Sequence, residues 1–292
     1  MVKLGLIGRG AWARVIGATL DSLPDVTWTA MSSPGPFVDG VIIANKSKNH
    51  FASALPFVEA GVPCFVEKPL ATNLPDFLHL QAISQATGSP VFAGHLHLFN
   101  PAAQVFWAAL PQIGPLQSAT ALCANAKPRA DTSVIWDWLP HPLSLADHLF
   151  AVPPDGVTAR RLDDHETAPQ HVVARLSYQG CSFDLEASWR APKPCFRITA
   201  TGRAGRLVFD DKAEHKVILI RSQNTQPLAY APDPPLTREL QAFVTMVKHS
   251  CKEGGQGGGN NPSPLSAAET MMRSLDAIER SVLAKGQKTK LK

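Results

Sequence analysis

Residues 41–69 carry the pattern that decides the fold, and they read VIIANKSKNHFASALPFVEAGVPCFVEKP. An apolar run, a turn, an amphipathic segment and a second apolar run follow one another, as in a strand, a helix and a second strand of a parallel sheet. The second run ends in Glu67-Lys68-Pro69. Ligands bind at the carboxyl ends of strands in open parallel sheets. A charge beside a buried strand is costly unless it is paired or used. Lys68 is therefore a candidate functional ammonium group.

A glycine motif at the start of the chain belongs to the same kind of fold. Residues 2–8 are the apolar run VKLGLIG, and residues 8–13 fit G-x-G-x-x-A at the start of a helical pattern that runs to about residue 23. The first glycine permits a tight turn, the second lets a pyrophosphate approach the backbone, and the small third residue lets helix and strand pack closely. A bare turn is the alternative. The position between strand and helix favours cofactor binding by Gly8, Arg9, Gly10, Ala11, Trp12 and Ala13.

The next expected strand, residues 26–32, ends without the acid that usually binds the ribose hydroxyls of NAD. Ser32 and Ser33 stand there instead. No negative charge would repel a 2′-phosphate, so the pattern permits NADP as well as NAD. Arg9 is a candidate partner for such a phosphate, and an exposed loop arginine is the alternative interpretation.

Only residues 33–39 separate this strand from the strand that begins near Gly40. A crossover that contains a helix takes at least about 10–12 residues, whereas seven extended residues reach roughly 23 Å at ~3.3 Å each. The spacing predicts a trimmed nucleotide-binding sheet that lacks one helix and one edge strand. The adenosine end of the site is then expected to be open.

Alternation of strands and helices continues to about residue 115. We expect helices over 49–60, 74–87 and from Asn100-Pro101 to about 110, with strands over 62–66 and 91–94. Strand-like runs then dominate at 116–125, 156–162, 170–178, 181–190, 195–211 and 215–221. One helix is expected over 142–150, two more near 236–249 and 265–284 would cover the sheet, and 254–264 would be a mobile surface loop. The fold class is therefore α/β plus α+β. A Rossmann domain (1–115) precedes a mainly antiparallel open-sheet domain (116–292) covered by helices.

Composition is ordinary for a soluble globular protein. The 292 residues are 45% hydrophobic and 18% charged, with a net charge of +4. No basic run indicates nucleic-acid binding, and no apolar run has the length of a membrane span. The start MVKLGLIG lacks the features of a signal peptide, and the five cysteines are scattered without a CxxC pair. We therefore expect a cytoplasmic protein with reduced thiols.

Taken together, these motifs resemble the glucose–fructose oxidoreductase, inositol dehydrogenase and MocA-type (Gfo/Idh/MocA) family. The matching segments are GLIGRGAWA (5–13), VIIANKSKNH (41–50), EAGVPCFVEKPL (59–70), Asp137-x-x-x-His141 and SPLSAAETMMRSLDAIERS (263–281). Residues 129–141, together with Ser188-Trp189, Pro192, Arg197, Gly202 and 209–211, resemble a branch associated with nucleotide sugars. The resemblance implies an NAD(P)-dependent dehydrogenase that acts on CH–OH groups of a sugar or nucleotide sugar. It also implies a homo-dimer or tetramer.

The resemblance places the family's catalytic lysine on Lys68, its carboxylate on Asp137 and its histidine on His141. An imidazole has the intrinsic pKa for moving the hydroxyl proton. Asp137, one helical turn earlier if that segment is helical, would hold the imidazole tautomer. Lys68 would donate a hydrogen bond to the developing alkoxide. A lysine that extends to solvent, and a helix-capping Asp/His pair, are the structural alternatives.

The remaining candidate residues come from the same resemblance. Ala44, Asn45, His50 and Glu67 would line the cofactor site, with a helix-cap role as the alternative for His50. His95, Arg129, Trp136 and Trp189 would contact substrate, and buried packing is the alternative for the tryptophans. The pair His95-x-His97 has metal-ligand chemistry but no third ligand at a suitable spacing, so no metal site is predicted.

Two other classes of function stay open. The short 33–39 segment, and Leu98, Leu139, Pro142 and Ser144 at positions where the family usually differs, fit a non-catalytic or regulatory nucleotide-binding protein. A reductase of a non-sugar double bond, of the bilin or imine type, would use the same scaffold without the Asp137/His141 pair.

Overall fold

The structure, a computed structural model, describes residues 1–32, 37–164, 168–222, 224–252 and 261–291. The chain divides into two compact units, Met1–Leu96 with Asp233–Glu269 and His97–Pro232 with Thr270–Lys292. The boundary expected near residue 115 lies inside the second unit by this division. One cut point does not describe the chain, because it returns to the first unit after residue 232.

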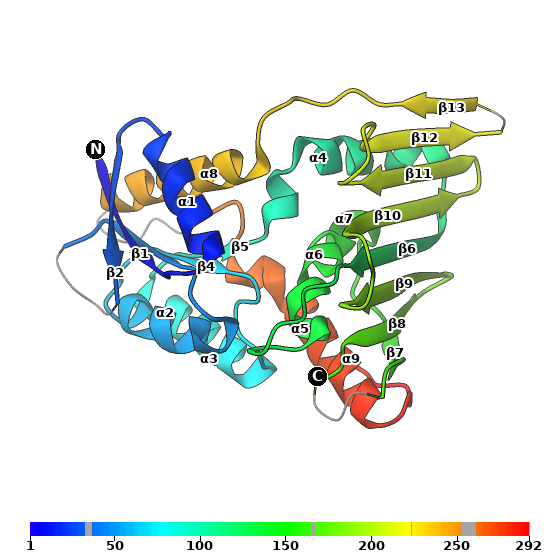
Figure 1. Cartoon of the computed structure of the whole chain (residues 1–292), viewed down its shortest axis with the longest axis horizontal. Coiled ribbons are helices and arrows are strands. Elements are labelled where there is room, and N and C mark those ends of the chain that lie inside the picture. The colour runs from blue at the N-terminus through cyan, green and yellow to red at the C-terminus, as the bar shows by residue number, and fades with distance from the viewer. Residues whose placement is uncertain (33–36, 165–167, 223, 253–260, 292) are drawn as a thin grey trace. The chain divides into compact units, whose positions relative to one another are not determined.

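The first unit contains a parallel sheet of five described strands in the order β2-β1-β3-β4-β5 (Figure 1). These strands are β1 (Val2–Ile7), β2 (Val26–Met31), β3 (Gly40–Ile43), β4 (Cys64–Glu67) and β5 (Val91–Gly94). Adjacent strands pair in parallel, and Glu67 lies opposite Gly94 at the carboxyl ends of β4 and β5. This sheet confirms the expected Rossmann-like architecture.

The position of β2 explains the short crossover. β2 pairs with one side of β1 and forms the sheet edge, while β3 pairs with the other side of β1. No further strand lies beyond β2 among the described residues. The expected loss of an edge strand is therefore confirmed. Residues 33–36 lie outside the described part of the chain, and residues 37–39 are neither helix nor strand.

Local signals set the helices of the first unit. They are α1 (Ala11–Asp21), η1 (Ser47–Asn49), α2 (His50–Glu59), α3 (Leu74–Thr87) and α8 (Pro235–Lys252). For α3 the Asn73 side chain accepts the Asp76 backbone N–H at 2.8 Å, and Gly88 ends the helix at φ 70°. These caps explain why the expected bounds of this helix are correct.

The second unit contains a sheet of eight described strands in the order β13-β12-β11-β10-β6-β9-β8-β7 (Figure 1). Their bounds are β6 (Leu116–Ala124), β7 (Gly156–Arg161), β8 (His171–Tyr178), β9 (Cys181–Ser188), β10 (Cys195–Gly202), β11 (Gly205–Asp210), β12 (Val217–Arg221) and β13 (Asn224–Pro227). All pairs are antiparallel except β6 with β9. The mainly antiparallel sheet is confirmed.

The helices of the second unit differ from those expected. They are η2 (Leu96–Phe99), which starts in the first unit, α4 (Pro101–Ala108), η3 (Leu110–Ile113), α5 (Val134–Trp138), α6 (Pro140–Leu143), α7 (Ala146–Leu149) and α9 (Leu265–Leu283), which begins in the first unit. The single helix expected over 142–150 is wrong, because three short helices span 134–149. Pro140 and Pro142 lack the backbone N–H that would continue α5 into α6. The break between α6 and α7 comes after Leu143, beyond both prolines.

Two further expectations are corrected, and one strand was missed. The run 195–211 is a hairpin of two strands, with Gly202 opposite Gly205. β13 was not predicted, since its four residues are all exposed and show no apolar alternation. The helix expected near 236–249 does not cover the antiparallel sheet; α8 belongs to the first unit, where it contacts α1 and β1. Residues 254–260 of the loop expected over 254–264 lie outside the described part of the chain.

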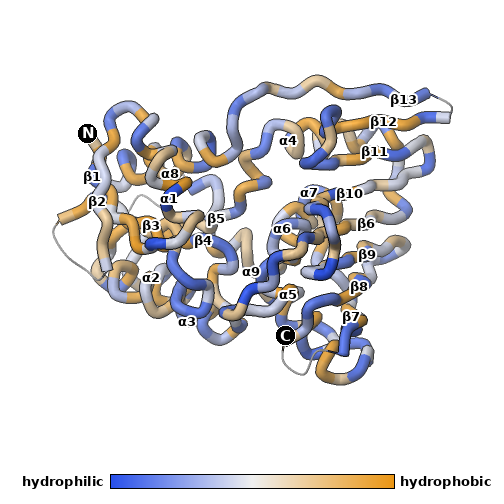
Figure 2. The backbone as a smooth tube through the Cα atoms, viewed as in Figure 1, coloured by the Kyte–Doolittle hydropathy of each residue, from blue (hydrophilic) through white to orange (hydrophobic). Residues whose placement is uncertain are grey.

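Hydropathy distinguishes the two sheets. In Figure 2 the tube is largely orange through β3 and β4, whereas the second sheet ranges from the largely orange β12 to the largely blue β13. Every residue of β3, β4 and β5 is buried, as expected for a parallel sheet covered on both faces.

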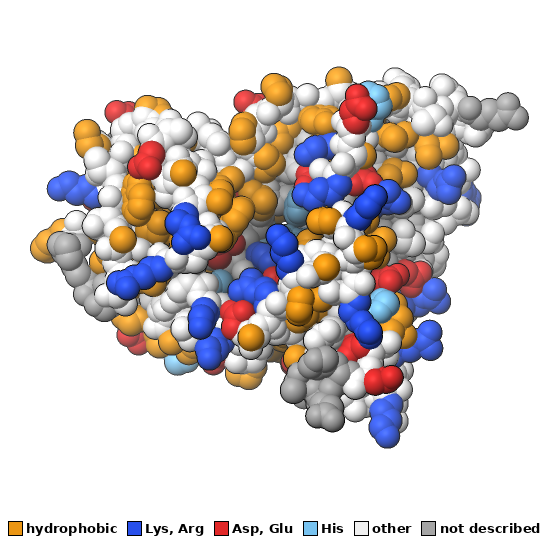
Figure 3. Space-filling view, viewed as in Figure 1, with side chains coloured by type: hydrophobic (Ala, Val, Ile, Leu, Met, Phe, Trp, Pro, Cys, Tyr) orange, Lys and Arg blue, Asp and Glu red, His pale blue; other side chains and the backbone are white. Residues whose placement is uncertain are grey.

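In the view of Figure 3, Lys and Arg side chains are interspersed with acidic and apolar ones. No helix in the described residues is long and apolar enough to cross a membrane.

Candidate functional site

The glycine loop between β1 and α1 lies against the end of β3. The Ala44 backbone N–H donates to the Ile7 carbonyl at 2.8 Å. A Cβ added to Gly8 would overlap the Ala44 carbonyl oxygen and lie 2.9 Å from the Cβ of Ala13. Gly10, the N-cap of α1, differs because an added Cβ there would meet no protein atom within 4 Å. Open space in front of an uncapped helix N-terminus fits a dinucleotide pyrophosphate.

Two matched substitutions separate the structural glycine from the ligand-facing one. We expect Gly10→Ala to leave the melting temperature unchanged and to weaken NADH binding about tenfold or more, because its methyl group would occupy space for the pyrophosphate. Gly8→Ala is expected to lower the melting temperature by several degrees through the overlap with Ala44. Thermal unfolding and NADH titration of both variants test this. Wild-type NADH affinity in Gly10→Ala would contradict the assignment.

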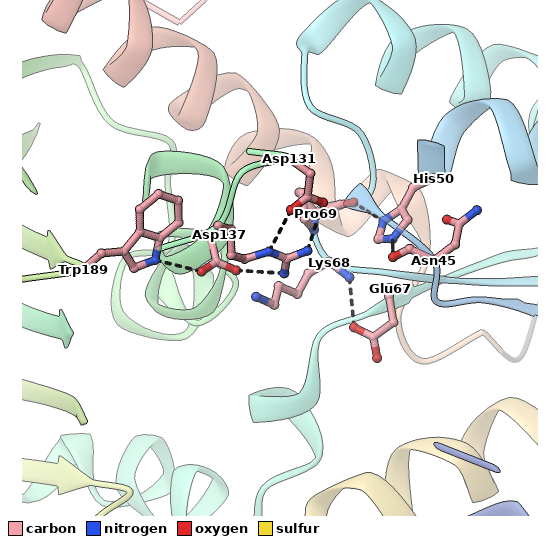
Figure 4. Close-up of polar contacts among 9 residues, drawn as sticks. Asn45, His50, Glu67, Lys68, Pro69, Asp131, Asp137 and Trp189 are labelled. Atoms are coloured by element: carbon pink, nitrogen blue, oxygen red, sulfur yellow. Dashed lines mark hydrogen bonds and ion pairs between the residues drawn. The ribbon is translucent and has the colours of Figure 1, made fainter. Parts of the chain in front are cut away.

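Trp12 and Glu67 join the glycine loop to the end of β4. The indole N–H of Trp12 donates to Oε1 of Glu67 at 2.5 Å. Oε2 of Glu67 accepts the backbone N–H of Lys68 at 3.1 Å (Figure 4). Glu67 is only 6% exposed, whereas Trp12 is 40% exposed. Two motifs far apart in the sequence are therefore joined through one buried carboxylate.

His50 connects the turn after β3 to the segment after Lys68. Its Nδ1 lies 2.7 Å from the Pro69 carbonyl oxygen and its Nε2 lies 3.2 Å from the Asn45 carbonyl oxygen (Figure 4). The side chain is buried, and the N-cap of α2 is Asn49. The imidazole contacts carbonyl oxygens outside the helix, so it does not cap α2. Its contribution to cofactor binding stays a prediction.

The residues expected near the adenosine end are exposed where they are described. Ser32 follows β2 directly, and Ser33 lies outside the described residues. Arg9 is exposed, and its carbonyl oxygen accepts the Arg14 Nη1 group at 3.2 Å. Ser32 carries no negative charge, so this residue would not repel the 2′-phosphate of NADP.

In the second unit, Asp137 is held by two different donors. Nη1 of Arg129 donates to Oδ1 of Asp137 at 3.3 Å, and the Trp189 indole donates to Oδ2 at 3.1 Å (Figure 4). Arg129 also makes a two-point contact with Asp131, at 3.2 Å from Nε and 3.1 Å from Nη2. Both Asp137 oxygens thus accept side-chain donors, which argues against a helix-capping role.

His141 lies among aromatic rings. Its ring centroid is 5.1 Å from that of His97, 5.6 Å from that of Trp138 and 5.8 Å from that of Phe196. His97 in turn stacks on Phe196 at 4.1 Å. Asp137 and His141 lie on the consecutive short helices α5 and α6, which share Leu139 as a terminal residue. The sequence pattern singled out His95 and His97 as a pair with metal-ligand chemistry, with packing or a place in the substrate cleft as the alternative, and did not predict the contact of His97 with His141.

The other expected substrate residues are buried. Trp136 is 3% exposed, and its indole donates to Oε1 of Glu279 at 3.1 Å. Trp189 is 4% exposed, and His95 follows β5 in the first unit at 5% exposure. Burial lowers the pKa of His95 to about 4, so its imidazole is neutral at pH 7. Within the described residues, no group of three or more His, Cys, Asp or Glu side chains is arranged to hold a metal ion.

Glu239 on α8 is a buried acid that no sequence motif marks. It is 1% exposed. The segment TREL in residues 237–240 reads as an ordinary helix start, so no local signal marks this carboxyl group. Its neighbours come from distant parts of the chain.

Comparison with known families identifies the class of this fold. Residues 5–95 match the model described as "Oxidoreductase family, NAD-binding Rossmann fold", and residues 113–208 match the "GFO/IDH/MocA C-terminal domain". The chain belongs to the Gfo/Idh/MocA family of oxidoreductases. The glycine loop and the five-stranded sheet lie in the first matched segment, and Asp137 and His141 lie in the second.

Two named relatives match parts of the chain. UDP-N-acetylglucosamine 3-dehydrogenase of Acidithiobacillus ferrooxidans is 32% identical over 126 residues, which are 42% of this chain and 39% of the relative. Inositol 2-dehydrogenase 1 of Saccharopolyspora erythraea is 42% identical over 65 residues, which are 22% of this chain and 19% of the relative. The matched segments span less than half of either relative.

A solved structure shows the same fold over nearly the whole chain. The inositol dehydrogenase homolog of Azotobacter vinelandii, complexed with NADH and myo-inositol, superposes with a TM-score of 0.84 at 14% identity. The alignment covers 99% of this chain and 97% of that chain. At this identity the comparison shows the fold alone.

Proposed function

We propose that this chain is an NAD(P)-dependent dehydrogenase that moves a hydride between nicotinamide and a secondary hydroxyl or carbonyl carbon of a sugar or nucleotide sugar. The observation that carries the proposal is the connection from the glycine loop through Trp12 and Glu67 to Lys68. It places a lysine at the carboxyl end of a strand, next to a carboxylate that is itself bonded to the cofactor loop.

The cofactor assignment fits the residues present. The space in front of Gly10 accommodates a pyrophosphate, and Oδ1 of Asn45 is buried without a hydrogen-bond partner in the protein, as expected of an atom that meets a ligand. The nicotinamide, when bound, supplies the hydride acceptor or donor. Ser32 supports use of NADP beside NAD, because it leaves that strand end without a negative charge.

Three residues are assigned to the proton and the substrate oxygen. In the oxidation direction, a ring nitrogen of His141 takes the hydroxyl proton as the C–H bond breaks. The Lys68 ammonium group donates a hydrogen bond to the same oxygen and stabilises its developing negative charge. Asp137, fixed by Arg129 and Trp189, is assigned to hold the imidazole tautomer of His141. In the reduction direction the same proton returns from His141 to the oxygen.

The substrate class rests on the relatives and on the aromatic surroundings of His141. The named relatives are dehydrogenases of UDP-N-acetylglucosamine and of inositol, both of which are polyhydroxylated rings. Trp138 beside His141 supplies a flat surface that suits the C–H face of such a ring. Contacts of His95, Arg129, Trp136 and Trp189 with substrate, the homo-oligomer and the cytoplasmic location stay predictions.

One experiment tests the proposal against its alternatives. NADH and NADPH are titrated first, and NAD and NADP are then supplied with a panel that includes UDP-N-acetylglucosamine, other UDP- and dTDP-sugars and myo-inositol. We expect growth of the reduced-nicotinamide absorbance band with at least one member. Tight cofactor binding without any absorbance change across the panel would favour the non-catalytic nucleotide-binding alternative. Oxidation of reduced cofactor only by an imine or bilin would favour the double-bond reductase.

A further inference from the structure

One face of α8 places Glu239 at the carboxyl ends of β4 and β5. The ring of Phe243 lies 5.6 Å from Phe65 and 5.8 Å from Phe92, which are in the middle of these strands. One turn later, Val247 lies against the start of β3, because a Cβ on Gly40 would be 2.9 Å from its Cγ2. The helix, which lies beside α1 in Figure 1, therefore runs antiparallel to the strands.

The same geometry extends one turn in the other direction. Residues four apart share a helix face at a spacing of about 6 Å, which equals about two residues of a strand. Two residues beyond Phe65 is Glu67, and two residues beyond Phe92 is Gly94, which pairs with Glu67 in the sheet. His95 follows directly. Glu239, four residues before Phe243, therefore lies over Glu67 and His95.

Glu239, His95 and Glu67 differ in the hydrogen-bond partners of their side chains. Glu239 is 1% exposed, and neither of its carboxyl oxygens has a hydrogen-bond partner in the protein. Nε2 of His95 is likewise buried without one. Glu67 instead accepts the Trp12 indole N–H and the Lys68 backbone N–H. Donors stabilise a carboxylate, so the negative charge of the pair belongs on Glu67 and the proton on Glu239.

The electrostatics agree with this division. Burial and, second, the negative charge of Glu67 hold the pKa of Glu239 well above its ordinary value of 4.5. The His95 backbone N–H donates its hydrogen bond to the Ala93 carbonyl at 2.9 Å. Its positive end still lowers the pKa of Glu239 in part. Glu67 on β4 and His95 after β5 are thus titratable groups that face Glu239, and His95 is neutral at pH 7. The negative charge on Glu67 therefore favours the protonated form of Glu239.

We propose that Glu239 is a buried, neutral carboxylic acid that positions Glu67, and through Glu67 both Trp12 of the glycine loop and the Lys68 backbone, for dinucleotide binding. The proposal deepens the proposed function, because it rests on the glycine loop as the cofactor site. It does not require any particular substrate. Glu239 acts through Glu67 and is a positioning residue.

The first test measures the proton on Glu239 in the protein without cofactor or substrate. A carboxyl group whose pKa is raised on folding takes up a proton when the chain folds, so its stabilising contribution is present in full below pH 4.5 and is lost as the pH rises toward the folded pKa. Glu239→Gln has no such proton. We expect its stability relative to wild type to increase with pH, with the ratio of the unfolding constants changing about tenfold per pH unit within this window.

Denaturant unfolding of both proteins between pH 5 and 9 gives this ratio, with the same substitution at the exposed Glu59 as the matched control. The control ratio should not depend on pH. A pH-independent ratio for Glu239→Gln as well would overturn the neutral-acid assignment. This outcome differs from failure of the proposed function, since no turnover is measured.

The second test measures positioning. Glu239→Gln keeps a neutral polar group and is expected to bind NADH within about threefold of wild type at pH 7. Glu239→Leu removes the polar group and is expected to weaken NADH binding about tenfold or more. Energy transfer from tryptophan to the bound reduced nicotinamide reports binding. Wild-type affinity in Glu239→Leu would overturn the positioning role. If Glu239→Leu does not fold, a loss of NADH affinity in Glu239→Gln would overturn the positioning role.

Discussion

Replacing Lys68 by methionine should lower turnover about 10²- to 10³-fold while NADH still binds, because it removes the donor that stabilises the developing alkoxide. Methionine keeps an unbranched side chain of similar length. The Glu67 carboxylate would keep its bonds to the Trp12 indole and to the backbone N–H of residue 68, since neither involves the ammonium group. The loss should therefore appear in kcat more than in cofactor affinity.

The control for this variant is Lys48→Met, which changes an exposed lysine in the same unit. It should retain wild-type kcat, KM and NADH affinity. Steady-state kinetics with the substrate found in the panel, together with NADH titration, give all three quantities. Wild-type kcat in Lys68→Met would remove Lys68 from the chemical step.

The second large effect is expected at His141. His141→Ala should reduce kcat/KM about 10²- to 10⁴-fold, the usual contribution of a positioned acid or base. The limb of the pH–rate profile that belongs to the imidazole should disappear with it. Added imidazole should restore part of the rate, because the vacated space lies among the rings of His97, Trp138 and Phe196.

His171→Gln is the matched control in the same unit, since His171 pairs with Glu186 at 2.9 Å on β8 and β9 and has no assigned role. Its pH profile should match that of wild type. A variant at position 141 that loses activity but keeps both limbs of the profile would show that the proton passes through a different group.

The sequence predicted the first sheet well, because its signals are local and physical. The bounds of α3 follow from the Asn73 cap and from Gly88, and the missing edge strand follows from the length of residues 33–39 alone. A connection too short to hold a helix leaves few topologies open. Residue pattern and segment length are therefore enough to define the fold class of this part of the chain.

The errors have a common cause in long-range packing. The single helix expected over 142–150 is divided after Leu143, and no proline or glycine marks that break in the sequence. Glu239 was not singled out because its partners lie about 170 and 140 residues away in the sequence, and periodicity does not report such pairs. Likewise, no pattern around residues 129–137 indicated that Arg129 and Trp189 would share the two oxygens of Asp137.

The return of the chain to the first unit has a consequence for synthesis on the ribosome. Phe243 on α8 packs on Phe65 and Phe92, and the Ser263 carbonyl oxygen accepts the backbone N–H of Ala93 on the edge strand β5. The first unit therefore cannot complete its core until the antiparallel sheet has been translated and most of the chain has emerged. Domains usually fold in the order of their synthesis, N-terminal first. Here the N-terminal sheet must wait, with one apolar face uncovered, for residues 233–269 of its own chain.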